Sequence, residues 1–198
     1  LPYFLNHYIA EAANNTGANY FDLTEDVKLA EYVHDMAKNA AQAFVPQCGL
    51  APGLVNIIAN DLILQFEQVE TLEIRCGGLP KTSTHELHYA LTWSVDGLIN
   101  EYRRPCPALV DGELQALAAL GNLEQLQVDG LAYEAFNTSG GIGSLAKTYL
   151  GKINTLNYKT IRYPGHRDRM RFLMKGLRLG DDPELLKKIL LNALPQTE

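Results

Sequence analysis

Hydrophobic residues in the first quarter of the chain alternate between helical and extended spacing. Apolar positions at helical intervals predict a helix over residues 6–17, ended by Gly17, and a second helix that opens at Thr24. Short apolar runs at 19–23 and 44–45 predict strands. Helices and strands in such short alternation are typical of a doubly wound parallel sheet, of which we expect only the second half here.

The pattern changes after Phe66, where apolar and polar residues alternate as in a sheet with one solvated face. Asp111-Gly112 predicts a two-residue hairpin, and further strands are predicted at 69–75, 89–93, 133–136 and 157–162. From His166 the chain is predicted to be helical, with Met170, Leu173, Met174 and Leu177 on one apolar face and a last helix over 183–193. The predicted fold class is therefore α/β (α+β), with a mostly antiparallel sheet inserted after the parallel one and the last helices packed back on the first part.

Composition places the chain among ordinary globular proteins. It has 198 residues, of which 46% are hydrophobic and 20% charged, and 17 basic against 23 acidic residues give a net charge of −6. This balance argues against binding nucleic acid through bulk positive potential, and no apolar run approaches the length of a membrane span. The one concentrated basic stretch, residues 162–171, is interrupted by Asp168 and equally fits a solvated helix face.

Cysteine and histidine spacing predicts neither a disulfide framework nor a metal site. Cys48, Cys76 and Cys106 are an odd number without a CxxC pair, and the five histidines form no HxxxH pattern. Three buried, reduced thiols are expected, which suits a cytoplasmic protein. The chain begins with Leu1 and reads there as the interior of a domain, so we expect it to belong to a longer protein.

A glycine-rich corner at residues 48–60 is the centre of the predicted chemistry. Its sequence predicts a strand, a turn containing Gly49 and Pro52-Gly53, and a helix. The first amides of that helix, near Gly53 to Asn56, are expected to be unpaired and able to hold a carboxylate or phosphate oxygen. An ordinary strand-to-helix turn is the alternative.

Two further segments carry candidate binding groups. Residues 137–145 run from a predicted strand into Thr-Ser-Gly-Gly and a helix, and offer hydroxyls, a carboxamide and amides for a carboxylate or an amino acid backbone; a capped helix after a flexible turn is the alternative. Arg162 is predicted to clamp a carboxylate and His166 to transfer a proton near neutral pH, although both residue types are common on surfaces and in cores. Trp93 is predicted to wall a pocket or to lie in the core.

Five groups of motifs together resemble the saccharopine dehydrogenase-like family of amino acid oxidoreductases, including its lysine 6-dehydrogenase branch. They are CGLAPG at 48–53, GGLP at 77–80, LTWS at 91–94 with LINEY at 98–102, EAFNTSGG at 134–141 and YKTIRYPGH at 158–166. The motifs occur in the family's order over residues 1 to about 180.

The resemblance implies a Rossmann-type domain interrupted by a substrate and dimerisation domain. Residues 1–50 would be the C-terminal half of the NAD(P)-binding domain, 51–165 the substrate-binding and dimerisation domain, and 166–198 helices that return to the first domain. The family's G-x-G-x-x-G loop would precede residue 1, so this chain departs from the family by lacking its main cofactor anchor. A homodimer with a small amino acid substrate is expected, without nucleic acid or membrane partners.

The resemblance also implies NAD(P)-dependent hydride transfer at an amine-bearing carbon, through an imine that water attacks. His166 and Arg162 would be catalytic. Substrate would contact Trp93, Asn137, Thr138, Ser139, Gly140, Gly141 and Tyr163. The cofactor would contact Cys48, Gly49, Pro52, Gly53 and Asn56.

Several alternatives remain open from the sequence. Saccharopine carries three carboxylates and lysine one, and the sequence does not separate a saccharopine dehydrogenase from a lysine 6-dehydrogenase. A non-catalytic dimerisation or metabolite-binding module is a further alternative, and a metal hydrolase is weakened by the scattered histidines.

Overall fold

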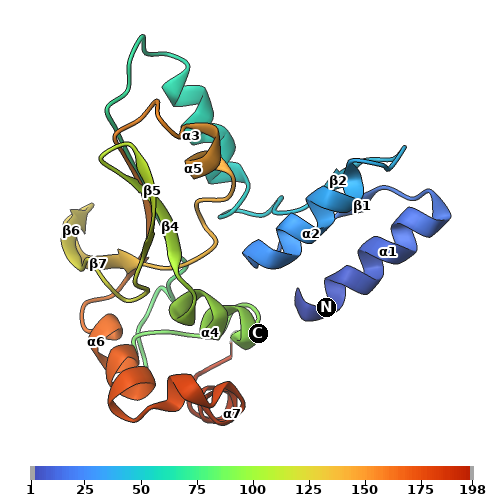
Figure 1. Ribbon diagram of the computed structural model, residues 1–198. Helices are drawn as coiled ribbons and strands as arrows, with labels where there is room; N and C mark the ends of the chain where they lie inside the picture. The colour runs from blue at the N-terminus through green and yellow to red at the C-terminus, as the bar shows by residue number, and fades with distance from the viewer. Residues whose placement is uncertain (1–2, 197–198) are drawn as a thin grey trace. The chain divides into compact units, whose positions relative to one another are not determined.

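The computed structural model describes residues 3–196 and divides the chain into two compact units. Of the described residues, the first unit contains 3–74, 107–115 and 140–157, and the second contains 75–106, 116–139 and 158–196. These boundaries differ from the three consecutive domains predicted from the sequence, because the chain passes between the units several times. Figure 1 shows the elements of both units.

The first unit begins with the predicted alternation of helices and strands. A short 3-10 turn, η1 (Tyr3–Leu5), leads into α1 (Asn6–Thr16), β1 (Tyr20–Phe21), α2 (Val27–Ala37), β2 (Phe44–Val45) and α3 (Leu54–Ile63). Strands β1 and β2 pair in parallel, with Tyr20 opposite Phe44. Helices α1 and α2 lie side by side (Figure 1). This confirms the small parallel sheet expected from the spacing of apolar residues.

Local sequence signals set the ends of these helices. Gly17 ends α1 in the left-handed conformation, with φ of 74°. The Asp26 carboxylate begins α2 by accepting a hydrogen bond from the Leu29 amide at 2.8 Å. The apolar faces then bury Ala10, Ala13, Tyr20, Leu29 and Val33 as one small core.

Strands of the larger sheet contribute to both units. They are β3 (Thr71–Cys76), β4 (Cys106–Val110), β5 (Glu113–Leu117), β6 (Glu124–Val128), β7 (Leu131–Asn137) and β8 (Thr155–Arg162), a six-stranded set among the described residues. In the first unit Leu109 of β4 pairs with Leu156 of β8, antiparallel. In the second unit β7 pairs antiparallel with both β6 and β8. The prediction of a mostly antiparallel second sheet is confirmed.

Two tight hairpins connect strands of this sheet. Asp111 and Gly112 both have positive φ, 53° and 79°, as a type I′ turn between β4 and β5 requires. Asp129 and Gly130 repeat the arrangement between β6 and β7, with φ of 52° and 78°. The first hairpin was predicted from its Asp-Gly pair, whereas β6 was not predicted.

Helices supply most of the core of the second unit. They are α4 (Val95–Arg103), α6 (His166–Arg171), one π-helical turn η2 (Phe172–Gly176), the 3-10 turn η3 (Leu179–Asp181) and α7 (Pro183–Ala193), while the first unit holds the short α5 (Leu145–Thr148). Leu98 and Ile99 of α4 pack in one cluster with Met170, Leu186 and Leu190. Helices α6 and α7 therefore share a core with α4, and the packing of residues 166–198 on the dinucleotide-binding part stays a prediction.

Two sequence predictions are corrected in the second unit. Residues 89–93 do not form a strand, because Tyr89, Ala90 and Leu91 are buried consecutively and only an isolated bridge joins Leu91 to Gln196. Leu177 is 52% exposed although it was placed on the buried helical face. The π-helical turn η2 adds a residue to the turn and so rotates Leu177 away from the face that buries Met170 and Met174.

Candidate functional site

In the glycine corner of the first unit, the backbone of Gly53 lies directly against that of Gly49. Gly53 has φ of 135°, and a Cβ atom there would overlap the backbone of Gly49. The Leu54 amide donates to the Gly49 carbonyl at 2.8 Å, and the Gly49 amide donates to the Pro52 carbonyl at 2.9 Å. Glycine at position 53 therefore follows from the conformation of the turn.

The first amides of α3 already have partners inside this corner. The Gly53 amide donates to the Asn56 side-chain oxygen at 2.6 Å, the Val55 amide to the Leu50 carbonyl at 3.0 Å, and the Asn56 amide to the Gly53 carbonyl at 3.0 Å. The prediction of unpaired amides awaiting an anion is therefore wrong. A capping side chain three residues into the helix and a tight turn satisfy them instead.

Asn56 also connects the corner to the second glycine-rich turn. Its side-chain nitrogen donates to the carbonyls of Gly141 at 3.2 Å and Ile142 at 2.9 Å. Gly140 has φ of 92°, and a Cβ atom there would lie 2.5 Å from Cβ of Glu25. The structure thus brings four predicted residues, Gly53, Asn56, Gly140 and Gly141, into one contiguous region of the first unit.

Cys48 joins this region to a buried carboxylate. Both its amide and its thiol donate to the Asp22 carbonyl, at 2.9 and 3.0 Å. The Asp22 side chain accepts from the Tyr20 hydroxyl at 2.5 Å and from the Thr24 amide at 2.8 Å. Burial, followed by the Asp22 contact, raises the pKa of Tyr20. The phenol is therefore neutral and acts as a hydrogen-bond donor.

The second unit contains a buried ionic cluster centred on Arg162. The Arg162 guanidinium, on β8, donates to the Tyr102 oxygen at 3.0 Å, the Thr160 hydroxyl at 2.7 Å, the Ile161 carbonyl at 2.9 Å and the Glu101 carboxylate at 3.2 Å. These bonds use four of the five donors of the guanidinium. Arg162 therefore retains one free donor, one fewer than a bidentate carboxylate clamp needs.

His166 lies at the other end of the same hydrogen-bond chain. Its Nε2 is 3.0 Å from the Tyr102 hydroxyl, and its Nδ1 is 2.6 Å from the Leu87 carbonyl. Because a carbonyl only accepts, Nδ1 carries the proton, and Tyr102 donates to Nε2. Arg162, Tyr102 and His166 thus form one directed relay whose members are all at most 3% exposed.

Burial is the largest influence on the pKa values of His166, Glu101 and Tyr102 in this cluster. Burial, with the nearby charge of Arg162, lowers the pKa of His166 to about 3. Burial raises the pKa of Glu101 to about 7, while the Arg162 charge opposes that rise. Burial also raises the pKa of the Tyr102 phenol. At neutral pH His166 is therefore a neutral acceptor.

Aromatic residues connect the cluster to Trp93. The Arg162 guanidinium lies over the Tyr89 ring, 4.9 Å from its centroid, and the Trp93 indole donates to the Tyr89 hydroxyl at 2.8 Å. The Ser139 amide donates to the Glu101 carbonyl at 3.0 Å. Trp93, Ser139, Arg162 and His166, predicted separately, are thus brought together in the second unit.

The remaining predicted residues surround this group in different ways. Asn137 is fixed by backbone bonds to Leu120 and Gly121, and its side chain donates to the Ala118 carbonyl at 3.3 Å. Tyr163 donates to the Pro80 carbonyl at 2.9 Å. The Thr138 hydroxyl is buried and has no hydrogen-bond partner among residues 3–196. An orphaned buried hydroxyl is a feature of ligand sites as well as of strained cores.

Sequence reasoning did not assign roles to Glu101, Tyr102 or Tyr89. The available signal was the run from Leu98 to Tyr102, in which apolar and polar residues are buried all round the helix. A carboxylate and a phenol on such a helix need buried partners, and Arg162 and His166 provide them.

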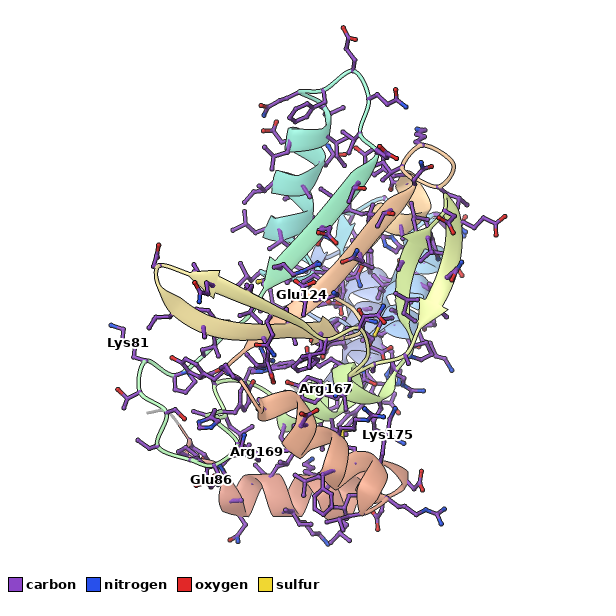
Figure 2. The ribbon with its side chains drawn as sticks, turned by 90° about the vertical axis from the view of Figure 1, so that its left-hand side faces the viewer. Lys81, Glu86, Glu124, Arg167, Arg169 and Lys175 are labelled. Atoms are coloured by element: carbon purple, nitrogen blue, oxygen red, sulfur yellow. The ribbon has the colours of Figure 1, made fainter. Side chains whose placement is uncertain are left out.

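A second charged group stabilises the sheet of the same unit. Glu124 lies on β6 (Figure 2). It pairs with Arg75 and accepts a hydrogen bond from Lys159 at 2.5 Å. Burial opposes the charged form, but the two cations outweigh it and lower the pKa of Glu124. These residues join three strands of the unit.

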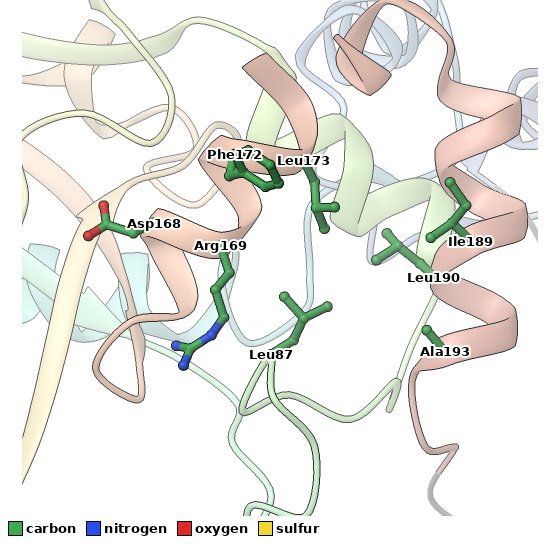
Figure 3. Close-up of a pocket in the computed structure, with 8 residues that line it drawn as sticks. All are labelled: Leu87, Asp168, Arg169, Phe172, Leu173, Ile189, Leu190 and Ala193. Atoms are coloured by element: carbon green, nitrogen blue, oxygen red, sulfur yellow. The ribbon is translucent and has the colours of Figure 1, made fainter. Parts of the chain in front are cut away.

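An apolar pocket of about 540 Å³ lies between α6, η2 and α7 (Figure 3). Asp168 points away from the other labelled side chains, while Arg169 extends beside Leu87. The pocket contains none of the predicted site residues. Its lining is Leu87, Asp168, Arg169, Phe172, Leu173, Ile189, Leu190 and Ala193.

The small parallel sheet and the larger antiparallel sheet define the chain as an α/β protein, and comparison with known proteins identifies its family. The family described as "Saccharopine dehydrogenase C-terminal domain" matches residues 49–193. The chain therefore belongs to the saccharopine dehydrogenase family of oxidoreductases.

A solved structure with a similar fold is the saccharopine dehydrogenase (L-Glu forming) from Saccharomyces cerevisiae. The two share 19% sequence identity with a TM-score of 0.66, and the match covers 88% of this chain and 41% of that one. This likeness shows the fold. The chain thus spans less than half the length of the yeast protein.

Within residues 3–196, no helix combines the length and apolar character that crossing a membrane requires.

Proposed function

We propose that this chain is part of an NAD(P)-dependent amino acid dehydrogenase of lysine metabolism that acts on saccharopine. The single observation that carries the proposal is the family match over residues 49–193, which includes both the corner residue Asn56 and the Arg162–His166 segment. When bound, NAD(P) supplies the hydride donor or acceptor for the amine-bearing carbon of the substrate.

Asn56 and the glycines that it connects are the residues proposed to contact the cofactor. Their backbone amides are satisfied within the corner, so the corner does not fit a phosphate group. The exposed side chains next to it, Leu54 and Ile57, are apolar and fit an uncharged ring instead. We therefore propose contact with the nicotinamide end of the cofactor.

Arg162 and His166 are proposed to act on the substrate through the groups that they hold. Because four donors of Arg162 are in use, its proposed role is to fix Tyr102 and Glu101 and to add positive charge near a substrate carboxylate. His166 accepts the hydrogen bond of the Tyr102 hydroxyl at Nε2, and its proposed role is to orient that phenol toward the substrate. Thr138 is proposed to bond a substrate oxygen or nitrogen, which would satisfy its hydroxyl.

The test is to follow nicotinamide absorbance with purified protein that contains this chain and a complete cofactor domain. Saccharopine, lysine alone, and lysine with 2-oxoglutarate are the substrates to compare. Turnover of saccharopine, or of lysine only with 2-oxoglutarate, supports the proposal, and identifying glutamate or 2-oxoglutarate as product assigns the bond that is cleaved. Turnover of lysine alone instead identifies a lysine 6-dehydrogenase.

A non-catalytic metabolite-binding module is the second candidate. It is favoured by the saturation of the cluster, since both ring nitrogens of His166 and four donors of Arg162 are occupied by protein groups. A protein that binds nicotinamide and saccharopine but turns over none of the three substrate mixtures would establish it. In the dehydrogenase, His166→Gln should reduce kcat, while exchange of the exposed Arg171 to Gln should leave it unchanged.

A further inference from the structure

Glu134 of β7 carries a buried carboxylate to which the proposed function gives no role. The residue begins the motif EAFNTSGG at 134–141 and is 3% exposed. A carboxylate so far from water needs hydrogen-bond donors from the fold, because burial without them is costly. Its donors therefore show which part of the chain Glu134 holds in place.

Both oxygens of Glu134 accept hydrogen bonds from backbone amides on either side of His166. The Gly165 amide donates to Oε2 at 2.9 Å, and the Arg167 amide donates to Oε1 at 2.6 Å. The His166 amide itself donates to the Tyr163 carbonyl at 3.2 Å. Three consecutive amides are thus fixed where α6 begins, and His166 lies between the two that Glu134 holds.

A second residue of β7 contacts the ring of His166. Phe136 lies nearly parallel to the imidazole, with the ring centroids 6.3 Å apart and the planes 11° from each other. Residues 134 and 136 project from the same face of the strand, because side chains alternate between its two faces. The ring nitrogens of His166 bond the Leu87 carbonyl and the Tyr102 hydroxyl, so the position of the backbone determines whether both bonds form together.

We propose that Glu134 is a positioning residue, which fixes the place of His166 and, through it, the direction of the Tyr102 phenol. The inference rests on the proposed function, in which that phenol faces the substrate. Glu134 also pairs with Arg162 between β7 and β8, but this pairing uses the backbone and not the carboxylate. A change of the Glu134 side chain should therefore disturb His166 and leave Arg162 in place.

The first readout is the exchange with water of the His166 Nδ1 proton, measured by NMR in the full-length protein labelled with ¹⁵N-histidine. The signal is assigned by its absence in His166→Gln. Glu134→Gln keeps the shape of the side chain but turns an NH₂ group toward one of the two amides, so one hydrogen bond is lost. Exchange should become faster by about tenfold or more, because the start of α6 opens more easily.

The second readout is steady-state kinetics with nicotinamide and the substrate that wild type turns over. Glu134→Gln should lower kcat by about tenfold and change KM by less than about twofold, because orientation is disturbed while substrate binding is not. Glu134→Asp keeps the charge but withdraws the carboxylate by one methylene, and it should lower kcat as well. Glu184→Gln, at an exposed position of α7 in the same unit, is the matched control and should change neither readout.

Several results would overturn the proposal. They are unchanged proton exchange in folded Glu134→Gln, an equal change in Glu184→Gln, or a rise in KM at unchanged kcat. Failure of both Glu134 variants to fold would also overturn it, because the residue would then be structural only. If wild type turns over no substrate, the proposed function fails, and the proton exchange still decides whether Glu134 positions His166.

Discussion

The glycine corner of the first unit and the ionic cluster of the second unit are held together by different interactions. In the corner, Gly53 and Gly49 approach so closely that no side chain fits, and one carboxamide, Asn56, completes the hydrogen bonds. In the cluster, Arg162 and His166 are buried and their charges and protons depend on Glu101 and Tyr102. Backbone conformation therefore determines the structure of the corner, whereas buried charges and hydrogen bonds determine that of the cluster.

This difference determines how each region responds to change. Removing a hydrogen-bond partner from a partly exposed turn leaves neutral groups that water can reach in part. Removing a partner from the cluster leaves a charge buried at low dielectric constant. The expected effects on the free energy of unfolding therefore differ in size, and in the cluster they also depend on pH.

The largest effect is expected for Arg162→Met, which leaves the Glu101 carboxyl buried without its cation. We expect a loss of about 3–5 kcal/mol in the free energy of unfolding, measured by urea denaturation. Arg171→Met, at an exposed position of α6, is the control and should cost less than about 0.5 kcal/mol. A loss below about 1 kcal/mol for Arg162→Met would mean that the ion pair does not stabilise this unit.

In the corner, Asn56→Ala removes the acceptor of the Gly53 amide and the donor to the Gly141 and Ile142 carbonyls. We expect a smaller loss, about 2 kcal/mol, in the same urea experiment. Asn56→Asp keeps the acceptor but not the donor and should give an intermediate value. If Asn56→Ala cost as much as Arg162→Met, the distinction between the two regions would fail.

The pH dependence of the free energy of unfolding tests the ionic cluster and not the glycine corner. The pKa of His166 is lowered to about 3 from an ordinary value of 6.5, so the unfolded state binds more protons between those values, and stability is lost as pH falls below 6.5. The raised pKa of Glu101 has the opposite effect on stability, because the folded state binds more protons than the unfolded state between the ordinary value of 4.5 and about 7. The pH dependence of wild type alone therefore does not isolate the contribution of His166. The other charges that act on His166 are Arg162, His88 and Arg169.

The comparison of wild type with His166→Gln isolates the histidine, because Glu101 is common to both. The stability advantage of wild type over the variant should shrink by about 2 kcal/mol between pH 7 and pH 5, measured by urea denaturation at each pH. An advantage that stays constant over this range would show that His166 titrates near its ordinary pKa in the folded protein.

The smallest effect is expected for Thr138→Val, and it has the opposite sign. The Thr138 hydroxyl is buried without a partner among the described residues, so an apolar isostere should raise stability by about 1 kcal/mol. Thr160→Val is the matched control, because its hydroxyl accepts from Arg162 at 2.7 Å, and the same exchange should destabilise. A loss of stability in Thr138→Val would indicate that the hydroxyl is satisfied in solution.

Much of the fold was predictable because its signals are local. Gly17, Asp26 and Ser94 mark helix ends through their own backbone and side-chain chemistry. The alternation in β3, β7 and β8 and the Asp111-Gly112 turn similarly need only a few neighbouring residues. The segment 89–93 was mispredicted because a buried irregular segment and a strand share the same apolar pattern.

The sequence by itself determined the family resemblance and the α/β class with a mostly antiparallel second sheet, and it singled out Gly53, Arg162 and His166 as candidate site residues. Tertiary structure alone decided that the amides at Gly53 to Asn56 are satisfied and that Arg162 faces Glu101 and Tyr102, sixty-one and sixty residues earlier in the chain. Such partners are invisible to local patterns because they depend on which buried faces meet. Burial then fixes the protonation of each group, since a charge removed from water must find its partner in the fold.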